Sequence, residues 1–153
     1  MTKLIHRKGD IFKTHARAIG HGVNTQGVMG AGIAVQFKNR FPQMHMEYRE
    51  LCKSGKFNGG DVMPWSVKAP YGPDLMVFNI ASQEKPGANA SYDFLINGVK
   101  LATDICELAD QPVLALPRIG SGIGGLDEYV VEGILHSLST RTKVDIELWT
   151  YAS

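Results

Sequence analysis

Along this chain, short apolar runs typical of buried strands alternate with longer segments whose apolar residues recur at helical spacing. Short apolar runs of strand length occupy residues 3–7, 16–23, 75–82 and 112–120. Longer segments between and after them repeat their apolar residues at helical spacing, over 31–41, 43–55, 92–109 and 127–138. Strands that interleave with helices in this way predict an α/β fold, with helices on both faces of a mixed, largely parallel sheet.

Proline and cap residues refine the limits of these elements. Pro42 interrupts the first helical pattern, because proline removes a backbone donor and clashes with the preceding turn. Pro64 lies inside a further predicted strand, which we therefore expect near an edge of the sheet. Ser91 or Asn89 is expected to cap the helix that starts near residue 92, and residues 144–151 form a final alternating strand.

A glycine-rich turn follows the second apolar run, in "VNTQGVMGAGIAVQF" (23–37). Glycines permit close backbone approach, and N–H groups at the start of the following helix can hold an anion. The stretch has no Gly-Lys-Ser/Thr, and Val35 stands where a dinucleotide fingerprint needs its third glycine. Taken alone, the turn fits a tight strand-to-helix connection as well as a phosphate site.

A second glycine-rich stretch, "LPRIGSGIGGLDEYV" (116–130), repeats this design. Glycines at 120, 122, 124 and 125 cost more chain entropy than a simple turn requires, and the loop's N–H groups could surround a diphosphate. Loops at the carboxyl ends of neighbouring parallel strands face one crevice, so the two stretches together predict an anion site. Arg118 is either an anion ligand or a salt-bridged scaffold residue, and we favour the scaffold.

Net charge, cysteine content and the length of apolar stretches limit the kinds of partner that this chain is expected to bind. Sixteen Lys plus Arg against fifteen Asp plus Glu give a net charge of +1, which argues against a large basic surface for nucleic acid but not against a nucleotide. Cys52 and Cys106 have no metal-ligand pattern around them, so we expect reduced thiols and no metal. No stretch approaches the roughly 18 apolar residues of a membrane span. We expect a cytoplasmic, monomeric protein without membrane contact.

Two polar residues near the predicted crevice have two interpretations each. His21 lies on the second apolar run with Asn24 three residues on, so it is either a structural histidine or a general acid–base at the crevice mouth. Asp10 could accept a hydrogen bond from the amine of a base or cap a turn, and composition favours the cap.

Three stretches together resemble the macrodomain family. They are "KGDIF", "GHGVNTQGVMGAGIAVQFKNRFP" and "LPRIGSGIGGLDEYVVEGIL", whose order and spacing match over nearly the whole chain. The resemblance implies one domain over residues 1–153, a three-layer α/β/α sandwich that binds ADP-ribose in a cleft. The "MGAGIA" form is similar to the branch with terminal ADP-ribose glutamate hydrolases, DNA ADP-ribose hydrolases and yeast-type ADP-ribose-1''-phosphate phosphatases.

The resemblance also implies roles for individual residues. Asp10 takes the adenine amine with the Ile11 amide nearby, Tyr151 lies near the adenine, and Asn24 faces the distal ribose. Met29 is a further ligand-binding residue. The diphosphate would be held from two sides, by Gly30, Ala31, Gly32, Ile33 and Ala34 in the first loop and by Ser121, Gly122, Ile123, Gly124 and Gly125 in the second.

Departures from the family pattern bear on the chemistry. The glutamate-hydrolase relatives use a lysine where Ser82 and Gln83 stand, and their catalytic aspartate aligns with Gly124. His21 matches a histidine of the phosphatase relatives and is expected to act as general acid–base, with Asp127 as its partner carboxylate.

We therefore expect a cofactor-independent hydrolase that acts at the distal ribose of an ADP-ribose derivative. Its favoured form removes the 1''-phosphate of ADP-ribose-1''-phosphate, and its variant form releases ADP-ribose from an ester-linked protein or nucleic acid. His21, Asn24 and Asp127 are the catalytic candidates. The alternative is a non-catalytic ADP-ribose reader, since binding requires neither the lysine nor the loop aspartate.

Overall fold

The computed structural model describes residues 3–70, 74–121 and 124–151, and within them six strands form one sheet. The strand order is β1-β6-β5-β2-β4-β3, and every neighbouring pair is parallel except β3 and β4. The mixed, largely parallel sheet is thereby confirmed. The strands are β1 (Leu4–Lys8), β2 (Ala18–Val23), β3 (Val62–Val67), β4 (Leu75–Ala81), β5 (Val113–Pro117) and β6 (Asp145–Thr150).

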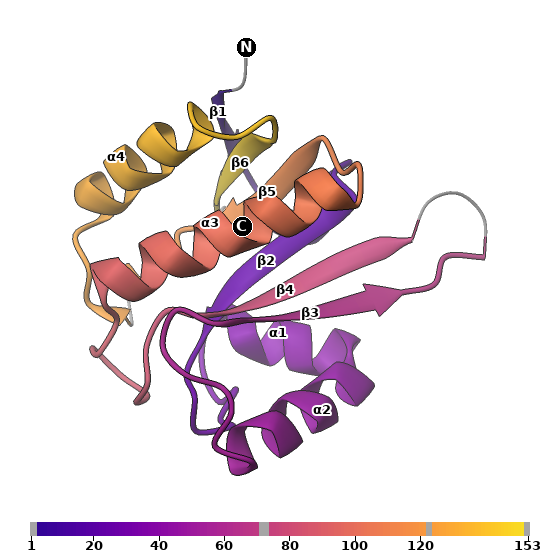
Figure 1. Cartoon of the computed structure of the whole chain (residues 1–153), viewed down its shortest axis with the longest axis vertical. Helices are drawn as coiled ribbons and strands as arrows, with labels where there is room; N and C mark the ends of the chain where they lie inside the picture. Colours follow the sequence, from indigo (N-terminus) through magenta and orange to yellow (C-terminus); the bar gives the residue numbers. More distant parts are fainter. Residues whose placement is uncertain (1–2, 71–73, 122–123, 152–153) are drawn as a thin grey trace.

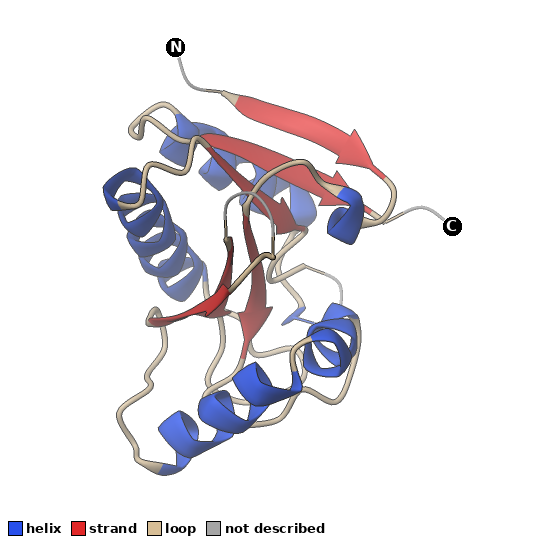
Figure 2. Ribbon diagram, turned by 90° about the vertical axis from the view of Figure 1, so that its right-hand side faces the viewer, coloured by secondary structure: helices blue, strands red, loops and turns tan. Residues whose placement is uncertain are grey.

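Helices cover both faces of this sheet. Figure 1 shows α3 and α4 together on one side and α1 and α2 together on the other, and Figure 2 shows the strands between them. The predicted α/β/α layering is confirmed. The helices of the described ranges are α1 (Ile33–Arg40), α2 (Pro42–Lys53), α3 (Tyr92–Leu108) and α4 (Glu128–Ser139), with a short 3-10 helix η1 (Ile11–Lys13) after β1.

Burial follows strand position in the sheet. The central strands β4 and β5 are almost wholly buried, as their continuous apolar runs predict. The edge strand β1 is half exposed, and Pro64 lies exposed in the other edge strand, β3, where its missing donor removes no essential ladder bond. The expected edge position of the Pro64 strand is confirmed.

The helix limits agree with the cap residues. Ser91 caps α3 by accepting a hydrogen bond from the Phe94 N–H, whereas Asn89 donates to the Pro86 carbonyl outside the helix. Pro42 is the first residue of α2 and separates it from α1. No helix in the described ranges is long and apolar enough to cross a membrane.

A polar contact crosses the middle of the sheet beneath α1. His21 on β2 is fully buried, and its ring stacks on Phe37 of α1 with centroids 3.8 Å apart and planes 7° apart. His21 Nε2 lies 2.7 Å from Asn79 Oδ1, and Asn79 Nδ2 donates to the Met63 carbonyl at 3.1 Å. Because the Asn79 amide already donates to Met63, its oxygen accepts from His21, which assigns the neutral Nε2–H tautomer.

Burial lowers the pKa of His21 to about 4 from its ordinary value near 6.5. In the unfolded chain His21 takes up a proton near pH 6.5, whereas in the folded chain it does so only near pH 4. The unfolded state therefore binds more protons between these values, and stability falls as the pH falls. From pH 7.5 to pH 4 this single residue should remove about 3 kcal/mol of unfolding free energy.

Urea unfolding of the wild type and of His21→Gln at pH 7.5 and pH 4 checks this expectation. Glutamine keeps a donor for Asn79 but does not titrate, so the variant should lose about 3 kcal/mol less than the wild type over this range. Its absolute stability at pH 7.5 should be lower, since the stacking on Phe37 is lost. Equal acid-induced losses in the two proteins would contradict the buried neutral histidine.

Candidate functional site

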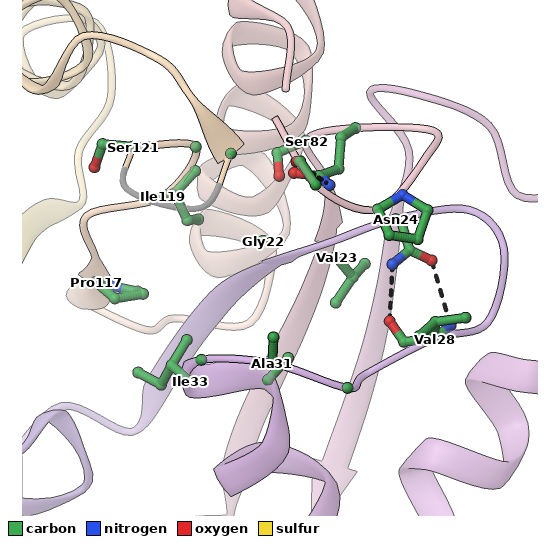
Figure 3. Close-up of a pocket in the computed structure, with 18 of the residues that line it drawn as sticks. Gly22, Val23, Asn24, Val28, Ala31, Ile33, Ser82, Pro117, Ile119 and Ser121 are labelled. Carbon is green, nitrogen blue, oxygen red and sulfur yellow. Dashed lines mark hydrogen bonds between the residues drawn. The ribbon is translucent and has the colours of Figure 1, made fainter. Parts of the chain in front are cut away.

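A cleft of about 510 Å³ opens where β2, β4 and β5 end (Figure 3). β2 lies between β5 and β4, and all three run parallel. The loops that follow them therefore leave the same edge of the sheet and converge, as expected. The described residues that line the cleft are Gly22, Val23, Asn24, Val28, Gly30, Ala31, Gly32, Ile33, Ala34, Ser82, Gln83, Pro86, Gly87, Pro117, Arg118, Ile119, Gly120, Ser121 and Gly124.

Asn24 shapes the first loop with its own side chain. Its Oδ1 accepts hydrogen bonds from the N–H groups of Gln26 (3.0 Å) and Val28 (3.3 Å), and its Nδ2 donates to the Val28 carbonyl at 2.8 Å. The two bonds to Val28 are visible in Figure 3. The buried Tyr48 hydroxyl lies 2.7 Å from the Asn24 carbonyl and 2.9 Å from its Oδ1. Asn24 lines the cleft, but its Oδ1 is committed to the loop and to Tyr48, and one of its two Nδ2 hydrogens is used by Val28.

The start of α1 forms one wall of the cleft. Gly32 caps the helix with φ of +61°, a left-handed conformation that favours glycine, and no side chain bonds to the first turn. No acidic residue occupies that turn, so its N–H groups and the positive end of the helix dipole are not neutralised locally. Gly30, Ala31, Ile33 and Ala34 line the cleft around this helix start, which suits an anion.

The second glycine-rich loop forms the facing wall. Gly120 has φ of +76°, its carbonyl accepts from the Leu126 N–H at 2.9 Å, and the Ser121 hydroxyl donates to the Arg118 carbonyl at 2.8 Å. A Cβ on Gly124 would lie 3.1 Å from Ala90 Cβ, so this position has little space for a side chain. The predicted residues Gly122 and Ile123 lie outside the described residues, and Gly125 does not line the cleft.

The end of β4 closes the cleft between these loops. Ser82 is buried against Gly22 so closely that a Cβ on Gly22 would lie 2.6 Å from the Ser82 hydroxyl oxygen. The Gln83 amide donates to the carbonyls of Lys85 (2.7 Å) and Gly87 (3.0 Å), which fixes the turn that follows. Ser82 and Gln83 thus line the cleft, and Lys85 is not among its described lining residues.

The structure does not bring the expected acid–base pair to the cleft. His21 is fully buried beneath α1, where its ring stacks on Phe37, whereas Gly22 and Val23, which follow it on β2, line the cleft. Asp127 caps α4 on the opposite face of the sheet, where its Oδ1 accepts from the N–H groups of Tyr129 (2.8 Å) and Val130 (3.3 Å). Neither residue lines the cleft, and the two cannot meet through the sheet. The expected pairing of His21 with Asp127 is corrected accordingly.

The residues expected near the adenine also lie outside this cleft. Asp10 caps η1 by accepting a hydrogen bond from the Phe12 N–H at 3.0 Å, so the cap interpretation of Asp10 is confirmed. Ile11 is buried in the core, and Tyr151 is 74% exposed. Met29, expected to bind the ligand at another point, is buried and lines a second pocket instead of this cleft. Their contacts with an adenine nucleotide stay predictions.

The cleft carries little side-chain charge. Arg118 is the one ionisable residue among its described lining, and its Nε donates to the Thr150 hydroxyl at 2.9 Å. Its Nη2 lies 3.9 Å from Glu132 Oε1, which agrees with the scaffold interpretation. Among the described residues, no three His, Cys, Asp or Glu side chains gather in a way that could hold a metal ion. The described lining of the cleft therefore offers backbone groups and uncharged side chains, with Arg118 as its one charge.

Comparison with known proteins places the chain in a family. The sequence pattern of the Macro domain family matches residues 21–135. A Thermus aquaticus protein named DNA ADP-ribosyl glycohydrolase is 30% identical over 146 residues, which cover 94% of this chain but 39% of that protein. An uncharacterized 17.5 kDa protein of Enterobacteria phage T4, from the tk-vs intergenic region, is 30% identical over 151 residues, with 93% of this chain and 94% of that protein covered.

Solved structures agree with the sequence comparison. The macrodomain of Mycobacterium tuberculosis DarG superposes with a TM-score of 0.88 at 27% identity, covering 99% of this chain and 100% of that one. The fold, the converging glycine-rich loops and the sequence match thus lead to one assignment. This chain belongs to the Macro domain family.

Proposed function

We propose that this chain binds the ADP-ribose part of an ADP-ribosyl derivative in the cleft and hydrolyses the bond at its distal ribose. The observation that carries the proposal is the convergence of two glycine-rich loops at the ends of neighbouring parallel strands. The diphosphate would lie between the start of α1 and the loop that contains Gly120, Ser121 and Gly124. Names carried by related proteins, among them DNA ADP-ribosyl glycohydrolase, support the hydrolase class.

Backbone recognition suits this ligand. A diphosphate carries its charge on several oxygens, and a helix start offers N–H groups that need no side-chain ordering. Small residues on both walls let the phosphates approach the main chain closely. Arg118 adds one positive charge to the described lining of the cleft and is held by its bond to Thr150.

The placement of His21 favours one form of the reaction over another. The phosphatase form relies on His21 as general acid–base, and this ring is fully buried against Phe37 of α1 and does not line the cleft. We therefore favour the glycohydrolase form, in which water attacks the anomeric carbon of the distal ribose and the linked group leaves. Such reactions pass through an oxocarbenium-like transition state with positive charge on the sugar. The nearby diphosphate would stabilise that charge, while the cleft holds the sugar in position.

A non-catalytic reader is the second candidate. The observation that favours it is the lack of any carboxylate, histidine or lysine among the described residues that line the cleft. A reader would bind ADP-ribose through the same two loops and release it unchanged. The two candidates therefore share the binding prediction and differ only in turnover.

Binding is tested with a matched pair of variants at Ala31. This residue is exposed, lines the cleft next to the α1 start and precedes the helix, so substitution there should leave the fold intact. Ala31→Asp places a carboxylate beside the proposed diphosphate site, whereas Ala31→Asn has nearly the same shape without charge. Repulsion on the order of 2 kcal/mol should weaken ADP-ribose binding by Ala31→Asp at least tenfold relative to Ala31→Asn, measured by calorimetry.

Two results of these titrations would contradict the proposal. If the wild-type protein gives no binding heat while it is folded, the proposed ligand is wrong. If the aspartate and asparagine variants bind ADP-ribose equally, the diphosphate does not lie at the start of α1.

Turnover and its pH profile separate the hydrolase from the reader. We expect free ADP-ribose to appear from an oligonucleotide that carries ADP-ribose on one base, followed by chromatography. Because no group that titrates near neutrality is among the described residues of the cleft, kcat should change less than about twofold between pH 5.5 and 8.5. A rate no higher than in buffer would leave only the reader. A bell-shaped profile centred near pH 6.5 would instead require a titrating side chain in the cleft.

A further inference from the structure

A second pocket of about 320 Å³ adjoins the cleft on the other side of the first glycine-rich loop. The described residues that line it are the loop residues Gln26, Gly27, Val28, Met29 and Gly30 and the helical residues Lys38, His45, Arg49 and Lys53. Val28 and Gly30 line both spaces. We call the second space the basic pocket.

The charges of the basic pocket have one sign. Lys38 comes from α1, while His45, Arg49 and Lys53 follow one another at four-residue spacing along one face of α2. No carboxylate is among its described lining residues, although the whole chain has a net charge of only +1. The basic pocket is therefore locally positive, although the chain as a whole is nearly neutral.

These cations are weakly neutralised by the protein itself. Lys53 lies 3.8 Å from Glu50, a contact between two largely exposed side chains that contributes little. No ion pair in the described ranges joins Lys38 or Arg49 to a carboxylate. The pKa of His45 is lowered first by burial and then by the charges of Lys38 and Arg49, as expected in a positive potential.

The wall of the basic pocket is preformed. Gly27 has φ of +83°, and a Cβ on it would lie 3.6 Å from the Arg49 Cα, so the loop packs directly on α2. Asn24 and Tyr48 hold the same loop from the inside through hydrogen bonds of 2.7 to 3.3 Å. Val28 projects from this loop with 48% of its surface exposed and stands between the two spaces.

We propose that the basic pocket binds a backbone phosphate of a nucleic acid whose ADP-ribose occupies the cleft. This inference rests on the proposed function and names its substrate class. A ligand that fills the cleft and continues past Val28 enters the basic pocket, since Val28 lines both. A polynucleotide carries a phosphate on each side of the modified unit, and Arg and Lys are the side chains that bind phosphate best.

The basic pocket also explains how a chain with a low net charge could bind a nucleic acid. A chain with net charge +1 has no broad surface for nucleic acid, but a substrate held by its ADP-ribose needs the protein to bind only one or two further phosphates. The exposed Val28 offers an apolar surface to the sugar or base that connects the two sites. Affinity for free ADP-ribose does not involve the basic pocket, so the two sites are separable by experiment.

The test compares three probes by fluorescence anisotropy on ice, before turnover proceeds. They are labelled ADP-ribose, a single-stranded oligonucleotide with ADP-ribose on one base, and a phosphoserine peptide that carries ADP-ribose. The wild type should bind the oligonucleotide at least tenfold more tightly than ADP-ribose in low salt. The double variant Lys38→Gln/Arg49→Gln should remove this gain while its affinity for ADP-ribose stays within twofold. The salt dependence of its oligonucleotide binding should fall by roughly 0.7 in slope for each phosphate that the variant no longer neutralises.

Lys143→Gln is the matched control. Lys143 is exposed and precedes β6, at the end of the sheet opposite to the cleft, so this variant should behave as the wild type with all three probes. Equal wild-type affinity for the oligonucleotide and ADP-ribose would overturn the proposal, as would a double variant no weaker than the control. An equal gain with the phosphopeptide would replace nucleic acid as the ligand class. A wild type that fails to bind ADP-ribose would instead refute the proposed function itself.

Discussion

The position of β2 between β5 and β4 is the constraint on which the cleft depends. Close packing holds it there, because a Cβ on Gly20 would lie 2.9 Å from a Leu116 methyl group and one on Gly22 would lie 2.6 Å from the Ser82 hydroxyl. On the opposite face, the stacked His21 and its bond to Asn79 tie β2 to α1 and β4. Three strand ends are thus aligned, and the loops that follow them have to meet.

The alignment leads to two neighbouring spaces with different linings. Inside the cleft, glycines and alanines present the main chain, and Arg118 is the one charged side chain of the described lining. Outside it, beyond Val28, charged side chains gather on α1 and α2. Backbone groups suit a ligand part that is always the same, whereas flexible charged side chains suit phosphates whose positions vary with the attached chain. The loop held by Asn24 separates the two regions.

Much of this arrangement could be predicted from the sequence. Strand-length apolar runs that alternate with helical segments predict the α/β class. Pro64 predicts that its strand lies at an edge of the sheet, and the glycines of both loops indicate a cleft at the strand ends. The capping role of Asp127 could also have been predicted, since an acidic residue directly before an amphipathic helix is a typical N-cap.

Other features of the site depend on tertiary packing and could not be predicted from the sequence. Val23 lies on the same face of β2 as His21 and reaches the cleft, whereas His21 is covered by Phe37, so its position depends on where α1 packs on the strand. The commitment of the Asn24 amide depends on how its loop closes over Tyr48. The spacing of His45, Arg49 and Lys53 was visible as one helix face, but only the packing of α1 against α2 adds Lys38 to it.

Amide signals of a ¹⁵N-labelled sample, followed while ADP-ribose is added, test most directly the claim that the main chain holds the diphosphate. The largest chemical-shift changes are expected on the amides at the start of α1, such as Ile33 and Ala34, and on Gly120 and Gly124 in the facing loop. Changes confined to residues outside these two loops, with both glycine-rich stretches unmoved at saturation, would contradict it.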